Sequence, residues 1–267
     1  MLQRLISALI LIPIALALVF FAPPVLYLAV LALVGCLCLH EFFRIMSRTG
    51  FRGHPWLGYA SFWILLAGIP MTRLPVDILC AAVLIINFLA AMWRNEPIRD
   101  RVHGLMANLL GVFYLAFCLR PALAVRFDFG ARTGLEWTLI LLAVIWVGDT
   151  AALLAGRQFG RTPFASRLSP RKTNEGAAAG LLAGLLVAVL LRYLFFPELP
   201  LKHVVATSLL IGAFGQLGDL AESMLKRAAE VKESSGLIPG HGGVLDRVDS
   251  MLFAFPVLYL YLLQIYP

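Results

Sequence analysis

About nine long apolar stretches follow one another along this chain, separated by short polar connections. A helix needs about 20 apolar residues to cross the hydrocarbon core of a bilayer, where its backbone hydrogen bonds must be satisfied internally. The pattern therefore predicts an all-α, polytopic integral membrane protein with about nine transmembrane helices. The stretches cover residues 5–22, 25–42, 56–71, 76–93, 104–120, 137–155, 176–196, 203–222 and 250–266.

Composition supports this prediction, because 61% of the 267 residues are hydrophobic and 14% are charged, unlike an ordinary soluble domain. The first stretch is longer than the ~7–15-residue apolar core of a secretory signal and lacks a clear cleavage site, so we expect an uncleaved helix. The cysteines all lie inside apolar runs, which favours inert core residues over a disulfide framework or a zinc site. They are Cys36, Cys38, Cys80 and Cys118.

The net charge of +7 indicates membrane orientation rather than nucleic-acid binding. With about nine spans and a cytoplasmic N-terminus, most Lys and Arg residues fall in cytoplasmic loops, as the positive-inside rule requires. The C-terminus then lies on the opposite side. The two most basic loops, near residues 157–176 and 226–247, share the cytoplasmic face, and we expect an active site there.

The two halves of the chain differ in their chemistry. Residues 1–135 contain about five apolar segments and read as a scaffold for dimerisation or lipid contact. Their His40-Glu41 pair is interpreted as interfacial rather than catalytic, and the basic stretch from Arg94 to Arg101 suits anionic lipid. Residues 136–267 contain about four segments and the two basic loops, so we predict that this half is catalytic.

One stretch, residues 223–249, holds a large share of the ionisable groups. Three glycines in Pro239-Gly240-His241-Gly242-Gly243 allow a tight backbone that could aim N–H groups at an anion. Cations, a glycine-rich anion cradle and paired carboxylates are typical of phosphoryl-group chemistry. The cations and donors are Lys226, Arg227, Lys232, His241 and Arg247, and the carboxylates are Glu230, Glu233, Asp246 and Asp249.

Helical spacing groups several of these side chains. Asp219, Ser223 and Lys226 are spaced i, i+4 and i+7 and share one helix face. Asp246 and Asp249 project from the first turn of the last helix on the same side. One aspartate there would be read as a helix cap, but two, after a glycine cradle, favour a metal site.

Asp149, at the cytoplasmic end of the sixth segment, is also unusual, because a carboxylate in hydrocarbon costs about 2.5–3.5 kcal/mol on insertion scales. It could lie at the headgroup level, but we favour a functional role.

Two polar stretches, residues 169–176 and residues 223–249, resemble the signature of the phosphatidate cytidylyltransferases, also called CDP-diacylglycerol synthases. Glu233 stands where that family has Asp, Arg171 replaces a usual Lys, and Asn174 replaces a frequent Trp. The resemblance covers the second half closely and the first half only in its hydrophobic organisation. The matching residues are Ser169, Pro170, Lys172, Thr173, Glu175, Gly176, Ser223, Lys226, Arg227, Lys232, Pro239, His241, Gly242, Gly243, Asp246, Arg247 and Asp249.

The resemblance implies that CTP and phosphatidate react to give CDP-diacylglycerol and pyrophosphate at a membrane of anionic lipid. We expect Asp219 and Asp246 to ligate Mg²⁺, with Asp249 as a ligand or supporting group and Asp149 helping to hold a second cation, either K⁺ or a second divalent ion. The expected phosphate-neutralising cations are Lys172, Lys226, Arg227 and Arg247.

Some of the remaining motif residues have one expected role, and others have two possible interpretations. Gly242 and Gly243 are expected to cradle the leaving pyrophosphate. His241 is a donor or acid to that group, or a structural residue of the turn. Ser223 and Thr173 bind phosphate or metal, or bond only their own backbone. The resemblance also implies a homodimer, which nothing in the residues shows.

Two alternatives remain at this point. A CDP-alcohol phosphotransferase also uses Asp and Mg²⁺ at a membrane, but its Asp-Gly-x-x-Ala-Arg pattern is absent from the sequence. A transporter could use Asp149 and Asp219 as coupling sites. The clustering of polar groups toward one face favours the enzyme.

Overall fold

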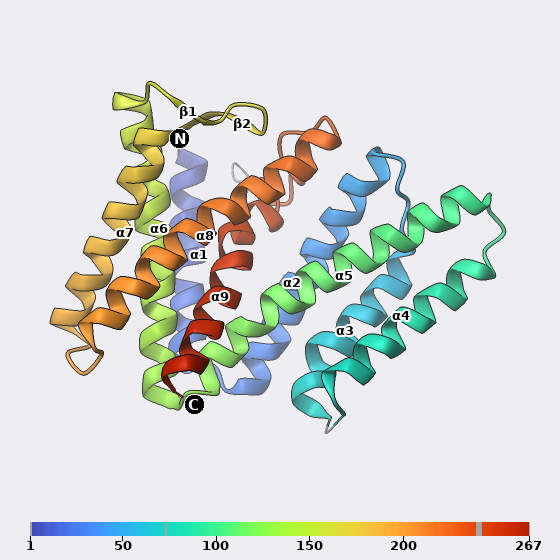
Figure 1. Ribbon diagram of the computed structural model, residues 1–267, viewed down its shortest axis with the longest axis horizontal. Coiled ribbons are helices and arrows are strands. Elements are labelled where there is room, and N and C mark those ends of the chain that lie inside the picture. Colours follow the sequence, from blue (N-terminus) through green and yellow to red (C-terminus); the bar gives the residue numbers. More distant parts are fainter. Residues whose placement is uncertain (1, 73, 239–241, 267) are drawn as a thin grey trace. The chain divides into compact units, whose positions relative to one another are not determined.

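The computed structural model describes residues 2–72, 74–238 and 242–266, with side chains described from Leu9 onward except at 69–71. These residues form nine α-helices and one short sheet (Figure 1). The helices are α1 (Leu2–Phe21), α2 (Pro24–Arg48), α3 (Pro55–Met71), α4 (Val76–Met92), α5 (Ile98–Phe127), α6 (Ala131–Phe159), α7 (Asn174–Leu194), α8 (Leu201–Ala228) and α9 (Leu245–Ile265).

Every apolar stretch predicted from the sequence coincides with one of these helices. Several helices continue beyond the apolar stretch into polar residues, most clearly α2, α5, α6 and α8. Six helices within the described residues, namely α2 and α5 to α9, are long and apolar enough to cross a membrane. The protein is therefore mainly helical, as predicted, and its apolar helices are those of an integral membrane protein.

A small sheet departs from the all-α prediction. Strands β1 (Pro163–Ala165) and β2 (Ser169–Thr173) pair antiparallel between α6 and α7, where the sequence predicted only a loop. The Glu175 carboxylate holds the base of this hairpin, because it accepts hydrogen bonds from the backbone N–H of Arg161 and from the Thr162 hydroxyl. The hairpin depends on this contact across more than ten residues, which a local hydrophobic pattern does not reveal.

The helices divide into two compact units. Unit 1 comprises Met1–Arg120 and Leu225–Arg247, and unit 2 comprises Pro121–Met224 and Val248–Pro267. Each unit is described by itself below.

In unit 1, the core is built around the second half of α2. Leu39, Phe42 and Ile45 on this helix are almost completely buried. A polar network joins the helices that follow: the Asn87 side-chain amide donates to the Ser61 hydroxyl at 2.8 Å, and the Asn108 side-chain amide donates to Asn87 Oδ1 at 3.1 Å. Because buried amides are costly unless they are paired, this network fixes how α3, α4 and α5 pack.

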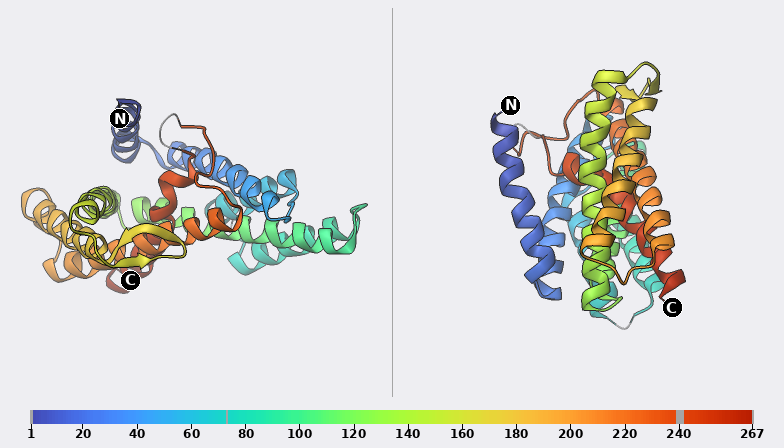
Figure 2. Two further views of the ribbon diagram at one scale, coloured as in Figure 1. Left: turned by 90° about the horizontal axis from the view of Figure 1, so that it is seen from above. Right: turned by 90° about the vertical axis from the view of Figure 1, so that its left-hand side faces the viewer.

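In unit 2, glycines bring α6 and α7 close together (Figure 2). A Cβ added to Gly180 would lie 2.9 Å from the Gly148 carbonyl oxygen, and one added to Gly176 would lie 2.7 Å from the Ala152 carbonyl oxygen. Small residues at such positions allow the close backbone approach typical of membrane helix pairs. The Gln216 amide of α8 donates to the Ala177 carbonyl of α7 at 3.0 Å, which ties a third helix to the pair.

Candidate active site

In unit 2, a carboxylate of α8 lies against a lysine of the hairpin. The Asp219 Oδ2 atom of α8 lies 2.5 Å from the Nζ atom of Lys172 on β2. The Ser223 hydroxyl, one helical turn further along α8, donates to Asp219 Oδ1 at 3.4 Å. The side chains of Lys172 and Asp219 are 28% and 32% exposed, so the pair remains accessible. The predicted shared face of Asp219 and Ser223 is thus confirmed by this contact.

Thr173 positions the lysine beside it. This residue is the N-cap of α7, and its hydroxyl accepts a hydrogen bond from the Gly176 N–H at 3.2 Å. A capping hydroxyl satisfies one of the N–H groups that a helix start leaves unpaired. Of the two readings of Thr173, the structure therefore supports the backbone bond, and its hydroxyl hydrogen is still available to an acceptor such as a phosphate oxygen.

In unit 1, a second lysine–aspartate pair is much more enclosed. The Lys226 Nζ atom lies 2.5 Å from Asp246 Oδ1, and the two side chains are 11% and 7% exposed. Asp246 Oδ2 also accepts hydrogen bonds from the Ser234 N–H at 2.9 Å, the Ser234 hydroxyl at 2.8 Å and the Gly243 N–H at 2.8 Å. The carboxylate therefore ties the segment before α9 to the end of α8.

Glu41 is a structural centre of unit 1 that the sequence interpretation missed. Its Oε1 atom accepts from the Ser235 hydroxyl at 2.5 Å and the Val244 N–H at 3.0 Å, and its Oε2 atom accepts from the Leu245 N–H at 2.8 Å. The Ser234 hydroxyl, 2.9 Å from Oε2, shares its one proton between Glu41 and Asp246. Glu41 is 2% exposed and binds distant parts of the chain, which its interpretation as part of an interfacial pair did not include. Its carboxylate fastens both ends of the 234–245 segment and caps the N-terminus of α9, where negative charge is favourable.

One sequence signal could have identified Glu41. A carboxylate at the end of a long apolar run is expensive unless it has partners, and Glu41 lies at the end of the second apolar stretch. Its partners lie about 200 positions away in the chain, and only the folded structure reveals them.

The two described glycines of the predicted anion cradle lie against these carboxylates. Gly242 has a positive φ of 79°, a region that favours glycine. A Cβ on Gly243 would lie 2.0 Å from the Ser234 hydroxyl and 2.4 Å from a Glu41 oxygen. In this structure the Gly243 N–H donates to Asp246. The absence of a side chain at Gly242 and Gly243 leaves space for the carboxylates of Asp246 and Glu41.

For the other predicted site residues the structure gives fewer contacts. Asp249, in unit 2, accepts a hydrogen bond from the Ser250 N–H at 2.7 Å. Asp149 on α6, Arg227 on α8 and Arg247 on α9 are exposed. His241 lies outside the described residues, together with Pro239 and Gly240.

The two aspartates predicted to bind Mg²⁺ differ in how well their surroundings suit a hard cation. Mg²⁺ prefers oxygen ligands and is commonly held by one or two carboxylates together with water and phosphate oxygens. Asp219 fits this pattern, because it is partly exposed and makes few contacts. Asp246 fits less readily, because one of its oxygens already accepts three hydrogen bonds. No group of three His, Cys, Asp or Glu side chains with a metal-binding arrangement occurs in the part of the chain that the structure describes.

Comparison with known proteins adds family evidence. The sequence model of the Cytidylyltransferase family matches residues 2–265. The chain is 35% identical to a phosphatidate cytidylyltransferase of Bacillus subtilis over 185 residues, which is 69% of this chain and 66% of that protein. It is 33% identical to a phosphatidate cytidylyltransferase of a Synechocystis species over an alignment of 292 positions, which covers 99% of this chain and 97% of that protein. The Bacillus alignment thus spans slightly less than two thirds of its relative, and the Synechocystis alignment spans nearly all of it.

Proposed function

The chain belongs to the cytidylyltransferase family, and on that premise we propose that it transfers a cytidylyl group from CTP to phosphatidate. The products are CDP-diacylglycerol, a precursor in phospholipid biosynthesis, and pyrophosphate. The observation that carries this proposal is the family match over residues 2–265, because it spans both polar motifs and therefore both lysine–aspartate pairs.

In this reaction an anion attacks an anion. A phosphate oxygen of phosphatidate forms a bond to the α-phosphorus of CTP, and the bond from that phosphorus to the oxygen leading to the β-phosphate breaks, which releases pyrophosphate. Such a transfer needs charge neutralisation and in-line positioning more than covalent catalysis. Lysine and arginine side chains are suited to the neutralisation.

The motif residues supply these roles in the proposal. Lys172 and Lys226 bind phosphate oxygens from the positions in which their aspartates hold them. The hydroxyls of Ser223 and Thr173 donate to phosphate. The remaining proposed contacts to the nucleotide and the leaving pyrophosphate come from Arg227, His241, Gly242, Gly243, Arg247 and Asp249.

A divalent cation belongs to the proposal as well. We assign Asp219 and Asp246 as Mg²⁺ ligands, with Asp149 near a second cation, K⁺ or a second divalent ion. When bound, Mg²⁺ offsets negative charge on the phosphate oxygens. Asp219 is the better supported of these ligands, because its carboxylate is partly exposed and paired with a single lysine.

The membrane arrangement is the last part of the proposal. We propose about nine crossings, a cytoplasmic N-terminus, a C-terminus on the opposite side and a catalytic face toward the cytoplasm. The distribution of Lys and Arg along the sequence supports this orientation. A homodimer is proposed from the family resemblance alone.

The test is a product assay with the purified full-length protein in mixed micelles. With CTP, phosphatidate and Mg²⁺, we expect equimolar formation of CDP-diacylglycerol and pyrophosphate. Omitting phosphatidate or adding a chelator in excess over Mg²⁺ should stop the reaction. Release of CMP from added CDP-diacylglycerol and an alcohol would instead indicate a CDP-alcohol phosphotransferase, and an absence of any CTP turnover would overturn the proposal.

A further inference from the structure

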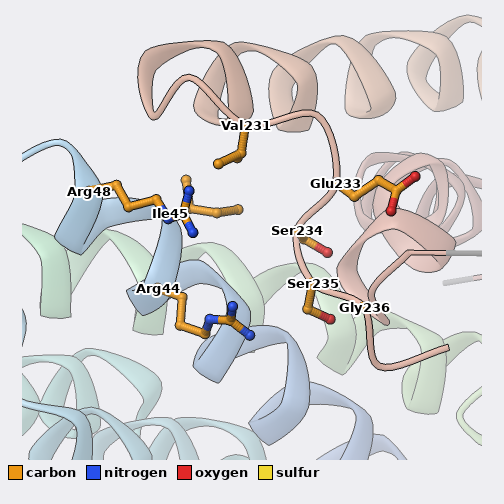
Figure 3. A pocket seen from close by; sticks show the side chains of 8 residues that line it. All are labelled: Arg44, Ile45, Arg48, Val231, Glu233, Ser234, Ser235 and Gly236. Carbon is orange, nitrogen blue, oxygen red and sulfur yellow. The ribbon is translucent and has the colours of Figure 1, made fainter.

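Two adjoining cavities in unit 1 share part of their walls. The first, called here the headgroup cavity, has a volume of about 240 Å³ and is lined by Arg44, Ile45, Arg48, Val231, Glu233, Ser234, Ser235 and Gly236 (Figure 3). The second, called the aromatic groove, has a volume of about 820 Å³. Its lining includes Cys36, Leu37, Trp56, Tyr59, Trp63 and Leu237. Arg44, Ser235 and Gly236 line both, so the two cavities are neighbours that share Arg44.

The headgroup cavity is suited to an anion. Arg44 and Arg48 lie one turn apart on α2 and therefore on the same helix face. Within residues 2–72, 74–238 and 242–266, neither guanidinium makes a hydrogen bond or ion pair. Two neighbouring cations without a counter-charge attract an anion, and the planar fork of arginine matches a phosphate group.

The acidic residues nearby leave this charge uncompensated. Figure 3 shows the Glu233 carboxylate pointing away from Arg44 and Arg48. The Glu41 carboxylate, at the border of the aromatic groove, is occupied by four hydrogen-bond donors. The hydroxyls of Ser234 and Ser235 donate to this carboxylate. Among the side chains that line the cavity, the two arginines are therefore available to bind an anion.

The aromatic groove has the opposite character. Tyr59 anchors its wall, because its ring packs edge-on against Trp56 and Phe43 at centroid distances of 6.1 and 6.4 Å, and its hydroxyl lies 3.2 Å from His40 Nδ1. The groove is within the ~300–1,000 Å³ range of cavities that hold small ligands. An apolar cavity that adjoins a second cavity with two arginines fits an amphiphile with an anionic head.

We propose that this pair of cavities is a phosphatidate-binding site, with the phosphate on Arg44 and Arg48 and an acyl chain in the aromatic groove. The choice of phosphatidate rests on the proposed function. Its phosphomonoester carries up to two negative charges near neutral pH, which matches the two arginines, whereas phosphatidylcholine has no net charge.

The two cavities contribute differently to binding. Lipid tails are as apolar as the side chains of the groove, so moving a chain from the bilayer into the groove gains little hydrophobic energy. Discrimination between phosphatidate and a zwitterionic lipid must therefore come from the arginines. The groove determines where the chain lies.

The experiment uses the full-length protein in phosphatidylcholine nanodiscs without CTP, so that no turnover is needed. Phosphatidate with brominated acyl chains is added, and quenching of tryptophan fluorescence is measured against brominated phosphatidylcholine. We expect stronger quenching by phosphatidate, and loss of most of this excess in the W56F/W63F variant. In the R44Q/R48Q variant the half-saturating mole fraction of phosphatidate should rise at least about tenfold.

Controls separate this site from general charge effects and from the proposed reaction. K202Q removes an exposed lysine of α8 that lines neither cavity and should bind phosphatidate like the unmodified protein. R44K/R48K keeps the charge without the fork and should show an intermediate loss, which also covers the case in which R44Q/R48Q fails to fold. In the product assay, R44Q/R48Q should raise the apparent KM for phosphatidate about tenfold and leave the KM for CTP unchanged.

Equal quenching by both lipids, or unchanged binding in a folded R44Q/R48Q variant, would overturn the site. Arginine-dependent quenching in a protein that forms no CDP-diacylglycerol would leave the lipid site standing and refute the proposed function instead.

Discussion

The two lysine–aspartate pairs carry the same charges in contrasting surroundings. Lys172 and Asp219 of unit 2 are about one third exposed, and a serine hydroxyl is a further neighbour of the carboxylate. Lys226 and Asp246 of unit 1 are about nine-tenths buried, and the carboxylate accepts three further hydrogen bonds from Ser234 and Gly243. Similar residues in one family signature thus have different physical tasks.

The difference in burial determines what each pair contributes. An exposed ion pair is worth about 0–1 kcal/mol of stability, because water screens it. Removing one partner of a buried pair costs about 3–5 kcal/mol, because it leaves an uncompensated charge. The Asp219 pair is therefore available for chemistry, whereas the Asp246 pair also organises the segment that precedes α9.

The largest expected effect is on the buried pair. Asp246→Asn should lower the free energy of unfolding by about 3 kcal/mol, because the buried Lys226 ammonium loses the negative charge that lies against it. The midpoint of thermal unfolding, followed by tryptophan fluorescence in detergent, measures this loss.

A double variant checks the cause of that loss. K226M/D246N removes both charges of the pair and should recover part of the lost stability, while cytidylyl transfer stays absent. A double variant as unstable as D246N alone would show that the hydrogen bonds to Ser234 and Gly243, and not the ion pair, dominate.

The exposed pair should give the next largest effect, on activity rather than on stability. We expect Asp219→Asn to reduce kcat by at least about 100-fold, the size of effect seen when one electrostatic stabiliser of a transition state is lost. Its unfolding free energy should change by less than about 1 kcal/mol. Rates are measured as CDP-diacylglycerol formed per folded protein, with Asp77→Asn, an exposed aspartate of α4, as the matched control. If D219N loses stability like D246N, the contrast between the pairs fails.

The helices could be predicted from the sequence because each coincides with an apolar run. Spacing also placed Asp219 and Ser223 together, since i and i+4 share a helix face wherever the helix packs. The choice of lysine for each aspartate could not be predicted in this way. Lys172 and Asp219 are 47 positions apart and Lys226 and Asp246 are 20 apart, so their pairing depends on the tertiary fold.

The sequence interpretation missed the residues whose partners lie far away along the chain. The 234–245 segment reads as a polar loop with a glycine cradle, and nothing local shows that its amides and hydroxyls bind Glu41 of α2. The same holds for the β1–β2 hairpin, which depends on Glu175. Sequence patterns record helix faces well, but they do not record which distant backbone a carboxylate will bind.

Glu41 gives a third and smaller test, because it extends the buried arrangement around Asp246. Glu41→Gln keeps the size of the side chain but turns an NH₂ group toward donors, so we expect a loss of about 2 kcal/mol in unfolding free energy. The same thermal measurement applies, with Glu96→Gln, at a half-buried glutamate that is paired with Arg94, as the control. A loss no larger than that of the control would mean that Glu41 does not fasten the 234–245 segment.

The smallest expected effect lies at the exposed pair again, in the cap that positions Lys172. Thr173→Ala removes the hydroxyl that accepts from the Gly176 N–H and should lower the free energy of unfolding by about 1 kcal/mol. Thr173→Ser restores the hydroxyl and should restore the stability, as measured by the thermal midpoint. If the serine variant is as unstable as the alanine variant, packing of the threonine methyl group and not the cap holds the start of α7, and Lys172 would then be positioned by the hairpin alone.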